Sequence, residues 1–128
     1  MTEEQLKTLI KQGEGQTLDF KDDRIHPRAL AETLAAFAAA DGGVVLIGVS
    51  DSGTIRGVSD FEKARDRIIY EAASRNHCDP QIQPIELEKI ETSDGKFVVA
   101  LTVPADYETL HSVGGKFFLR VGSRDEAL

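Results

Sequence analysis

The chain has 128 residues and a mass of 14.0 kDa, which predicts one domain able to bury its own hydrophobic core. Its 22 acidic residues outnumber its 15 basic ones, so the formal net charge is −7. This balance disfavours attraction of nucleic acid to the whole surface, which needs clustered cations, but leaves open a local basic patch or a carboxylate metal site. The longest apolar run, residues 34–40, is far too short to cross a membrane, and Cys78 has no disulfide partner. We therefore expect a cytoplasmic protein with no membrane partner.

Two helices are predicted in the first third of the chain. The first spans residues 2–12, where Thr2 can act as the N-cap and Gly13 can end the helix. The second begins at Pro27, because proline fits the first turn of a helix. Its apolar spacing continues to the glycine pair at residues 42–43, and its many alanines suit close approach to other elements.

Between these helices, residues 17–21 alternate as a β-strand does. Leu18 and Phe20 would face the core, whereas Asp19 and Lys21 would face an exposed groove on the other side. Strands are depleted in aspartate, so an acid beside a base on one strand face is unusual. This strand is therefore the first candidate for a functional site.

The middle of the chain predicts a strand, a turn and a helix. Residues 44–50 form a continuous apolar run typical of a fully buried strand. An Asp-Ser-Gly turn leads into residues 54–58, and we expect the two segments to pair as a hairpin. A third helix is predicted over residues 60–76, opened by a capping box of Ser59 and Glu62.

The rest of the chain is predicted to be β-structure. Strands are expected at residues 82–91, 96–103 and 116–121, and Pro84 places the first of them at the edge of a sheet. Together these elements predict an α+β fold for residues 1–128. We expect a single domain in which one mixed or antiparallel sheet is combined with three helices.

Three carboxylates, Glu14, Asp19 and Asp51, form a candidate catalytic and metal site. Glu14 lies in a glycine-flanked turn, Asp19 on the strand that follows, and Asp51 at the end of the buried strand. If the two strands are neighbours, the side chains converge, and such oxygen ligands suit the Mg²⁺ or Mn²⁺ that assists phosphodiester cleavage. Lys21 could contact a phosphate. The alternative is that Asp51 only initiates a turn, while Asp19 and Lys21 form a solvated ion pair.

Gly42 and Gly43 do not form a phosphate-binding loop. Such a loop follows a strand and precedes a helix, whereas this pair follows a helix and precedes a strand. We expect the two glycines to adopt positive φ angles and to allow close packing between helix and strand.

The C-terminal strand is a candidate nucleic-acid-binding surface. Its alternation predicts a face turned toward the core, formed by Phe117, Leu119 and Val121. The opposite face carries a set that Arg124 extends into the tail: Lys116, Phe118 and Arg120. An aromatic ring between two cations is suited to stacking on a base and neutralising phosphates. The alternatives are an edge strand protected by charge, or an aromatic side chain covered by a helix or a second subunit.

Four segments in this order resemble the Schlafen AlbA-like domain, also called a divergent AAA domain. They are GEGQTLDFK at residues 13–21, AFAAADGG at 36–43, VLIGVSDSGTIRGV at 45–58 and GGKFFLRVGS at 114–123. The resemblance covers nearly the whole chain. It implies an α+β, nucleic-acid-associated domain of the kind that often forms the N-terminal part of bacterial transcriptional-regulator proteins. The chain would then be either a stand-alone domain or a piece of such a regulator.

The resemblance also bears on the carboxylates. In eukaryotic Schlafen relatives a similar domain cleaves structured RNA with three carboxylates, and matching by motif places two of them at Glu14 and Asp19 and the third at Asp51. This sequence departs from the family pattern at Asp19, where glutamate is usual. The shorter side chain reduces its reach toward a metal ion.

Three functions stay open at this point. The favoured one is a DNA- or RNA-binding domain that uses Lys21 and the C-terminal cationic set without chemistry. The second is a Mg²⁺- or Mn²⁺-dependent nuclease that uses the three carboxylates. The third is a protein-interaction or homo-oligomerisation domain, in which the strand at residues 116–121 pairs across chains at a sheet edge.

Overall fold

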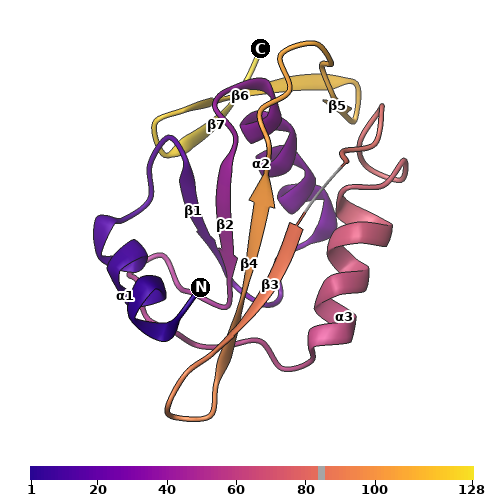
Figure 1. Cartoon of the computed structure of the whole chain (residues 1–128). Coiled ribbons are helices and arrows are strands. Elements are labelled where there is room, and N and C mark those ends of the chain that lie inside the picture. The colour runs from indigo at the N-terminus through magenta and orange to yellow at the C-terminus, as the bar shows by residue number, and fades with distance from the viewer. Residues whose placement is uncertain (84–85) are drawn as a thin grey trace.

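The structure is a computed structural model that describes residues 1–83 and 86–128 (Figure 1). A mixed four-stranded sheet has the order β1-β2-β4-β3, and a separate three-stranded sheet has the order β5-β6-β7. The helical elements are α1 (Glu3–Gln12), α2 (Pro27–Ala39), α3 (Phe61–Asp66) and its π-helical continuation η1 (Arg67–Ala72). The strands are β1 (Leu18–Lys21), β2 (Gly43–Ile47), β3 (Glu86–Glu91), β4 (Phe97–Val103), β5 (Ser112–Val113), β6 (Lys116–Val121) and β7 (Arg124–Ala127).

The α+β class is confirmed, but the prediction of a single sheet is wrong, and α2 supplies the reason. All but one of its residues from Leu30 to Ala38 are buried, and a helix that is apolar all round needs cover on more than one side. α2 packs against the four-stranded sheet, η1 and β6. The C-terminal strands therefore cover α2 as a second sheet instead of extending the first (Figure 1).

The four-stranded sheet has apolar residues on both of its faces. β1 and β2 are parallel, with Asp19 opposite Val45, and β4 is antiparallel to β2 and β3. On one face Leu18 and Phe20 pack with Leu6 of α1. On the other face Val45 and its neighbours pack against α2. β1, which carries Asp19, and β2, which leads toward Asp51, are thus neighbours, as the convergence of those side chains requires.

The first two helices begin where the sequence predicts. Thr2 and Gln5 form a capping box at the start of α1, and Gly13 ends it with φ 79°. Pro27 is the first residue of α2, and the His26 ring accepts a hydrogen bond from the Arg28 amide. His26 therefore acts as an N-cap.

The third helix differs from its prediction at both ends. Its N-cap is Asp60, whose carboxylate accepts from the Lys63 amide, and the predicted cap Ser59 instead donates to Asp23. The α-helix ends at Asp66, and the chain continues as a π-helix only to Ala72. Aspartate and serine are equally good caps, so the sequence does not decide between adjacent residues.

Two further predicted elements are shorter in the structure. The expected hairpin after β2 is reduced to one antiparallel bridge between Val49 and Ile55. The strand predicted to begin at residue 82 begins at Glu86, and β3 does lie at the sheet edge. Pro84, on which that edge prediction rested, lies outside the described residues. Among the described residues, none of the helices combines the length and apolarity that crossing a bilayer requires.

The glycine pair before β2 behaves as predicted. Gly42 and Gly43 have φ angles of 71° and 155°. A Cβ atom on Gly42 would lie 2.6 Å from the Val103 carbonyl oxygen, and one on Gly43 would lie 2.5 Å from that of Thr17. These residues allow the chain to turn from α2 into β2 while lying against neighbouring backbone.

The orientation of β6 is the reverse of the prediction. Phe118 is 8% exposed and Arg120 is 2% exposed, whereas Phe117 and Val121 are 40% and 41% exposed. The face carrying Phe118 and Arg120 lies on α2, and Arg120 is buried because its guanidinium finds polar partners there. The predicted alternation of side chains along β6 is correct, but the face predicted to lie on the core is the exposed one.

Candidate functional site

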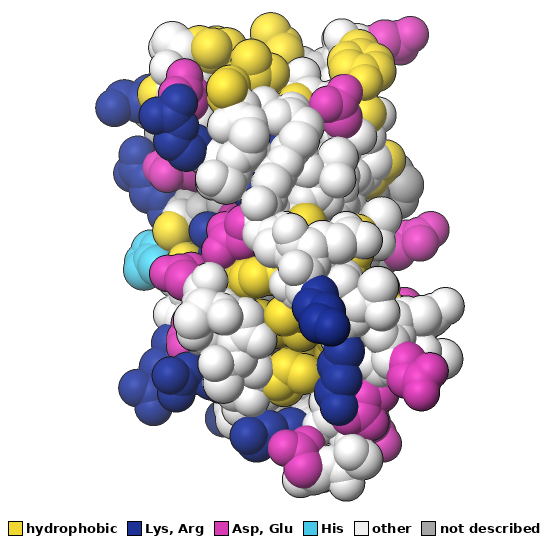
Figure 2. All heavy atoms as spheres, turned by 90° about the vertical axis from the view of Figure 1, so that its left-hand side faces the viewer, with side chains coloured by type: hydrophobic (Ala, Val, Ile, Leu, Met, Phe, Trp, Pro, Cys, Tyr) yellow, Lys and Arg dark blue, Asp and Glu magenta, His cyan; other side chains and the backbone are white. Residues whose placement is uncertain are grey.

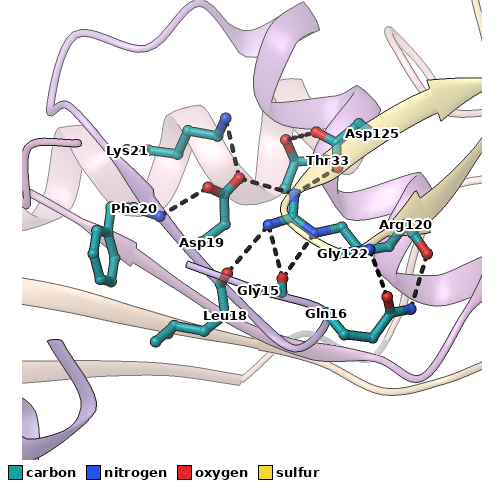
Figure 3. A network of polar contacts seen from close by, with 10 residues as sticks. All are labelled: Gly15, Gln16, Leu18, Asp19, Phe20, Lys21, Thr33, Arg120, Gly122 and Asp125. Carbon is teal, nitrogen blue, oxygen red and sulfur yellow. Dashed lines mark hydrogen bonds and ion pairs between the residues drawn. The ribbon is translucent and has the colours of Figure 1, made fainter. Parts of the chain in front are cut away.

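Asp19 lies on the α2 side of β1 and is only 3% exposed, so the exposed groove predicted for it is absent. Its Oδ1 accepts from the Phe20 amide at 2.9 Å. Its Oδ2 lies 3.1 Å from the Lys21 ammonium and 3.4 Å from Nη1 of Arg120 (Figure 3). The predicted pair of Asp19 and Lys21 therefore exists, but its acid is buried and is shared with a second cation.

Arg120 is the centre of this polar network (Figure 3). Its guanidinium donates two hydrogen bonds to the Gly15 carbonyl, at 3.0 and 3.1 Å, and one to the Leu18 carbonyl at 3.1 Å. Nη1 also lies 2.8 Å from Asp125, and the group sits over the Phe37 ring, 4.7 Å from its centroid. The planar guanidinium thus joins the start of β1 to the β6–β7 hairpin.

Two polar side chains extend the network. Asp125 accepts a 2.5 Å hydrogen bond from the Thr33 hydroxyl of α2. The Gln16 amide donates to the Arg120 carbonyl at 2.8 Å and accepts from the Gly122 amide at 2.8 Å. Among the described residues, no buried side-chain nitrogen or oxygen lacks a hydrogen-bond partner. The network is therefore a satisfied structural unit.

Glu14 is half-buried beside this network. Burial of its carboxyl raises its pKa to about 8, and a hydrogen bond with Asp19 and the negative charges of Asp19 and Asp51 add to the shift, while Lys21 opposes it. Asp19 and Asp51 therefore both lie close enough to Glu14 to influence its carboxyl. At neutral pH the Glu14 carboxyl is mostly protonated.

The donor arrangement does not fit a metal ion held by these carboxylates. Both oxygens of Asp19 already accept from N–H donors, one of them from two cationic groups. Across residues 1–83 and 86–128, no three or more His, Cys, Asp or Glu side chains are placed to hold a metal ion. Asp51 is exposed and lies near Glu14. The site brings Asp19 and Asp51 each near Glu14 without forming a cation cage.

The predicted nucleic-acid-binding residues divide into two groups. Lys116 and Arg124 are exposed, and Lys21 is half-buried against Asp19. Phe118 and Arg120 are buried and cannot stack on a base or reach a phosphate. The prediction that these two residues form a binding face is therefore wrong, because α2 covers that face of β6.

The structure adds a cation that the sequence analysis missed. The guanidinium of Arg28, at the start of α2, lies directly against Gly114 in the turn that leads to Lys116. Arg28 is exposed, and its only acidic contact among the described residues is Glu32 at 3.8 Å. Eighty-odd residues of sequence separate Arg28 from Lys116, so only the fold reveals that Arg28 lies at the turn that precedes Lys116. On the face in Figure 2, Lys and Arg side chains gather along the left-hand edge with acids between them.

Comparison with known proteins gives one family and one fold. A family model described as Schlafen, AlbA_2 matches residues 14–128. No curated protein matches the chain. Among solved structures, the DIP2311 protein of Corynebacterium diphtheriae shares the fold, with a TM-score of 0.69 over 98% of this chain at 19% sequence identity. This chain spans 29% of that protein's length.

Proposed function

The chain belongs to the Schlafen AlbA_2 family, and on that premise we propose that it is a DNA-binding domain of the kind found in transcriptional regulators. The observation that carries the proposal is the close approach of the Arg28 guanidinium to Gly114, in the turn just before Lys116. Arg28 thus lies at a turn that Lys116 follows in the chain, and both cations are exposed, which suits contact with neighbouring phosphates of a nucleic-acid backbone.

The charge distribution supports a local patch rather than a general attraction. With a net charge of −7, most of the surface repels a polyanion. Lys21 is less suited to phosphate, because Asp19 holds its ammonium and Glu14 lies nearby. Phosphate contacts are therefore assigned to Arg28 and Lys116, for which the ion pairs among the described residues come down to Arg28 with Glu32 at the long distance of 3.8 Å.

Metal-dependent RNA cleavage is the second candidate function. One observation favours it: the negative charges of Asp19 and Asp51 both act on Glu14. The engagement of both Asp19 oxygens by N–H donors weighs against it. Binding without chemistry is therefore the better-supported proposal.

A pair of gels distinguishes the two functions. Wild type is mixed with labelled duplex DNA, single-stranded DNA or structured RNA, with Mn²⁺ or with EDTA. A native gel reports binding and a denaturing gel reports cleavage. We expect retention of duplex DNA in both conditions and intact strands throughout. Mn²⁺-dependent cleavage that Asp51→Asn abolishes would replace the proposal with the nuclease, and retention of RNA alone would change its target.

A matched pair of variants locates the surface. Arg28→Ala with Lys116→Ala removes both patch cations, whereas Lys7→Ala removes an exposed cation from α1, which covers the opposite face of the four-stranded sheet. We expect the double variant to lose retention and Lys7→Ala to keep it. Equal loss in both variants would mean that binding follows net charge rather than this patch.

A further inference from the structure

β7 has a free edge on the second sheet. It is the outer strand of the order β5-β6-β7, and its pairs with β6 include Arg124 with Val121 and Glu126 with Leu119. The Leu128 amide donates to the Phe117 carbonyl at 2.8 Å, which continues the ladder. In an antiparallel ladder this alternation turns the backbone groups of Asp125 and Ala127 away from β6. Among the described residues, no backbone group pairs with them on that side.

The side chains on the outward face of β7 are oppositely charged. Arg124 and Glu126 point to the same face, since they are two residues apart on a strand. They form an ion pair of 2.7 Å, with side chains 72% and 44% exposed. Exposed apolar side chains lie beside them: Val121, Phe117 and Leu128. Figure 2 shows hydrophobic side chains gathered at the upper end of the molecule, where Figure 1 places β6 and β7.

We propose that β7 pairs with β7 of a second copy of this chain, so that the two three-stranded sheets form one continuous sheet. The strands run antiparallel about a two-fold axis at Asp125. Arg124 then lies opposite the partner's Glu126, and Glu126 lies opposite the partner's Arg124. Opposite charges in directly facing positions stabilise an antiparallel pair, and an isologous interface satisfies both ion pairs at once.

Charge selects this register over the next one. An axis at Glu126 would place two glutamates opposite each other, which is destabilising. An axis at Asp125 places two aspartates opposite each other, but their carboxylates are already held by Arg120 and Thr33 of their own chains. It also turns the free backbone groups of Asp125 toward each other and brings Leu128, which is 77% exposed, over the partner's Gly122.

The interface differs from an edge pairing of β6. β6 is the central strand of its sheet, with β5 on one side and β7 on the other. Where β5 no longer pairs with β6, the side-chain amide of Gln16 donates a hydrogen bond to the Arg120 carbonyl. β7 is therefore the strand of this hairpin that is available to a second copy. Because the strand is only four residues long, we expect a concentration-dependent dimer rather than an obligate one.

Sedimentation equilibrium of the full chain tests the proposal with a charge exchange. Wild type is expected to shift from monomer to dimer over about a hundredfold range of concentration. Arg124→Glu and Glu126→Arg each place like charges across the axis, so each variant alone is expected to stay monomeric. Mixed together, they regain both opposite pairs and are expected to form a heterodimer.

The mixture separates the interface from folding, because neither variant can restore an ion pair within its own chain. Lys63→Glu on α3 is the matched control and should dimerise as wild type does. A wild type that stays monomeric, single variants that still dimerise, or a mixture that stays monomeric would each overturn the proposed pairing.

Discussion

We expect substitution of Arg120 to lower the free energy of unfolding strongly. Arg120→Ala would remove one of the two cations beside the buried Asp19, leaving Lys21, and would remove the side-chain donors to the Gly15 carbonyl. We expect it to lower the free energy of unfolding by about 3–5 kcal/mol, because it breaks a buried ion pair and leaves a backbone carbonyl without donors. Urea denaturation followed by circular dichroism measures this.

Arg124→Ala is the control for that substitution. Arg124 lies on the same hairpin, but its side chain is 72% exposed and forms an ion pair with Glu126. We expect a change within about 0.5 kcal/mol. Similar losses in the two variants would show that the hairpin, rather than the buried guanidinium, sets the stability.

Glu14 should make the stability depend on pH. Folding raises its pKa from 4.5 to about 8, so the folded state keeps a proton that the unfolded state releases in this range. The free energy of unfolding then falls as pH rises from about 5 to about 8. Glu14→Gln cannot ionise, so the stability of wild type relative to this variant should decrease across the range. Urea denaturation at several pH values tests it, and parallel pH profiles for the two proteins would contradict it.

At the residue scale, sequence reasoning finds the members of the site but not their roles. Glu14, Asp19 and Asp51 were expected to converge only if their strands are neighbours, and in the structure Asp19 and Asp51 both act on the pKa of Glu14. That Asp19 is buried depends on Arg120, about a hundred residues away. An arginine in an alternating strand resembles a solvent-facing residue, and only its partners reveal that it is buried.

The entry into β2 gives a prediction at the scale of elements. Gly43→Ala would place a Cβ atom 2.5 Å from the Thr17 carbonyl oxygen at a φ of 155°. We expect a loss of about 2 kcal/mol or more, since β1 and β2 must separate or the backbone must twist. Thermal unfolding measures it. Gly15→Ala is the control, because nothing lies within 4 Å of its Cβ position; an equal loss there would contradict the steric argument.

Helices and their caps follow from local sequence, whereas strand faces do not. Thr2, Gly13 and Pro27 act as predicted because capping depends on neighbours in the chain. The face of β6 depends on where α2 lies, and two alternating sets of similar composition give no local preference. The strand β7 was missed because its charged residues lack the apolar alternation of a strand.

At the scale of the whole molecule, α2 determines the architecture. Its alanine-rich sequence predicted close approach to other elements, and it is enclosed by the four-stranded sheet, η1 and β6. The second sheet was not predictable from periodicity, because periodicity identifies a buried face without identifying what covers it. The same packing brings Arg28 beside the turn before Lys116.

The central claim is that Arg28 and Lys116, at and after the turn at Gly114, bind DNA through its phosphates. The most direct test is the salt dependence of duplex DNA binding, measured by fluorescence anisotropy for wild type and for Arg28→Ala with Lys116→Ala. The logarithm of the binding constant falls with that of salt by roughly 0.9 for each phosphate contact. We predict that the double variant binds more weakly. We also predict that its salt-dependence slope is shallower by the amount that two phosphate contacts contribute. Equal slopes and affinities for the two proteins would contradict the proposed surface.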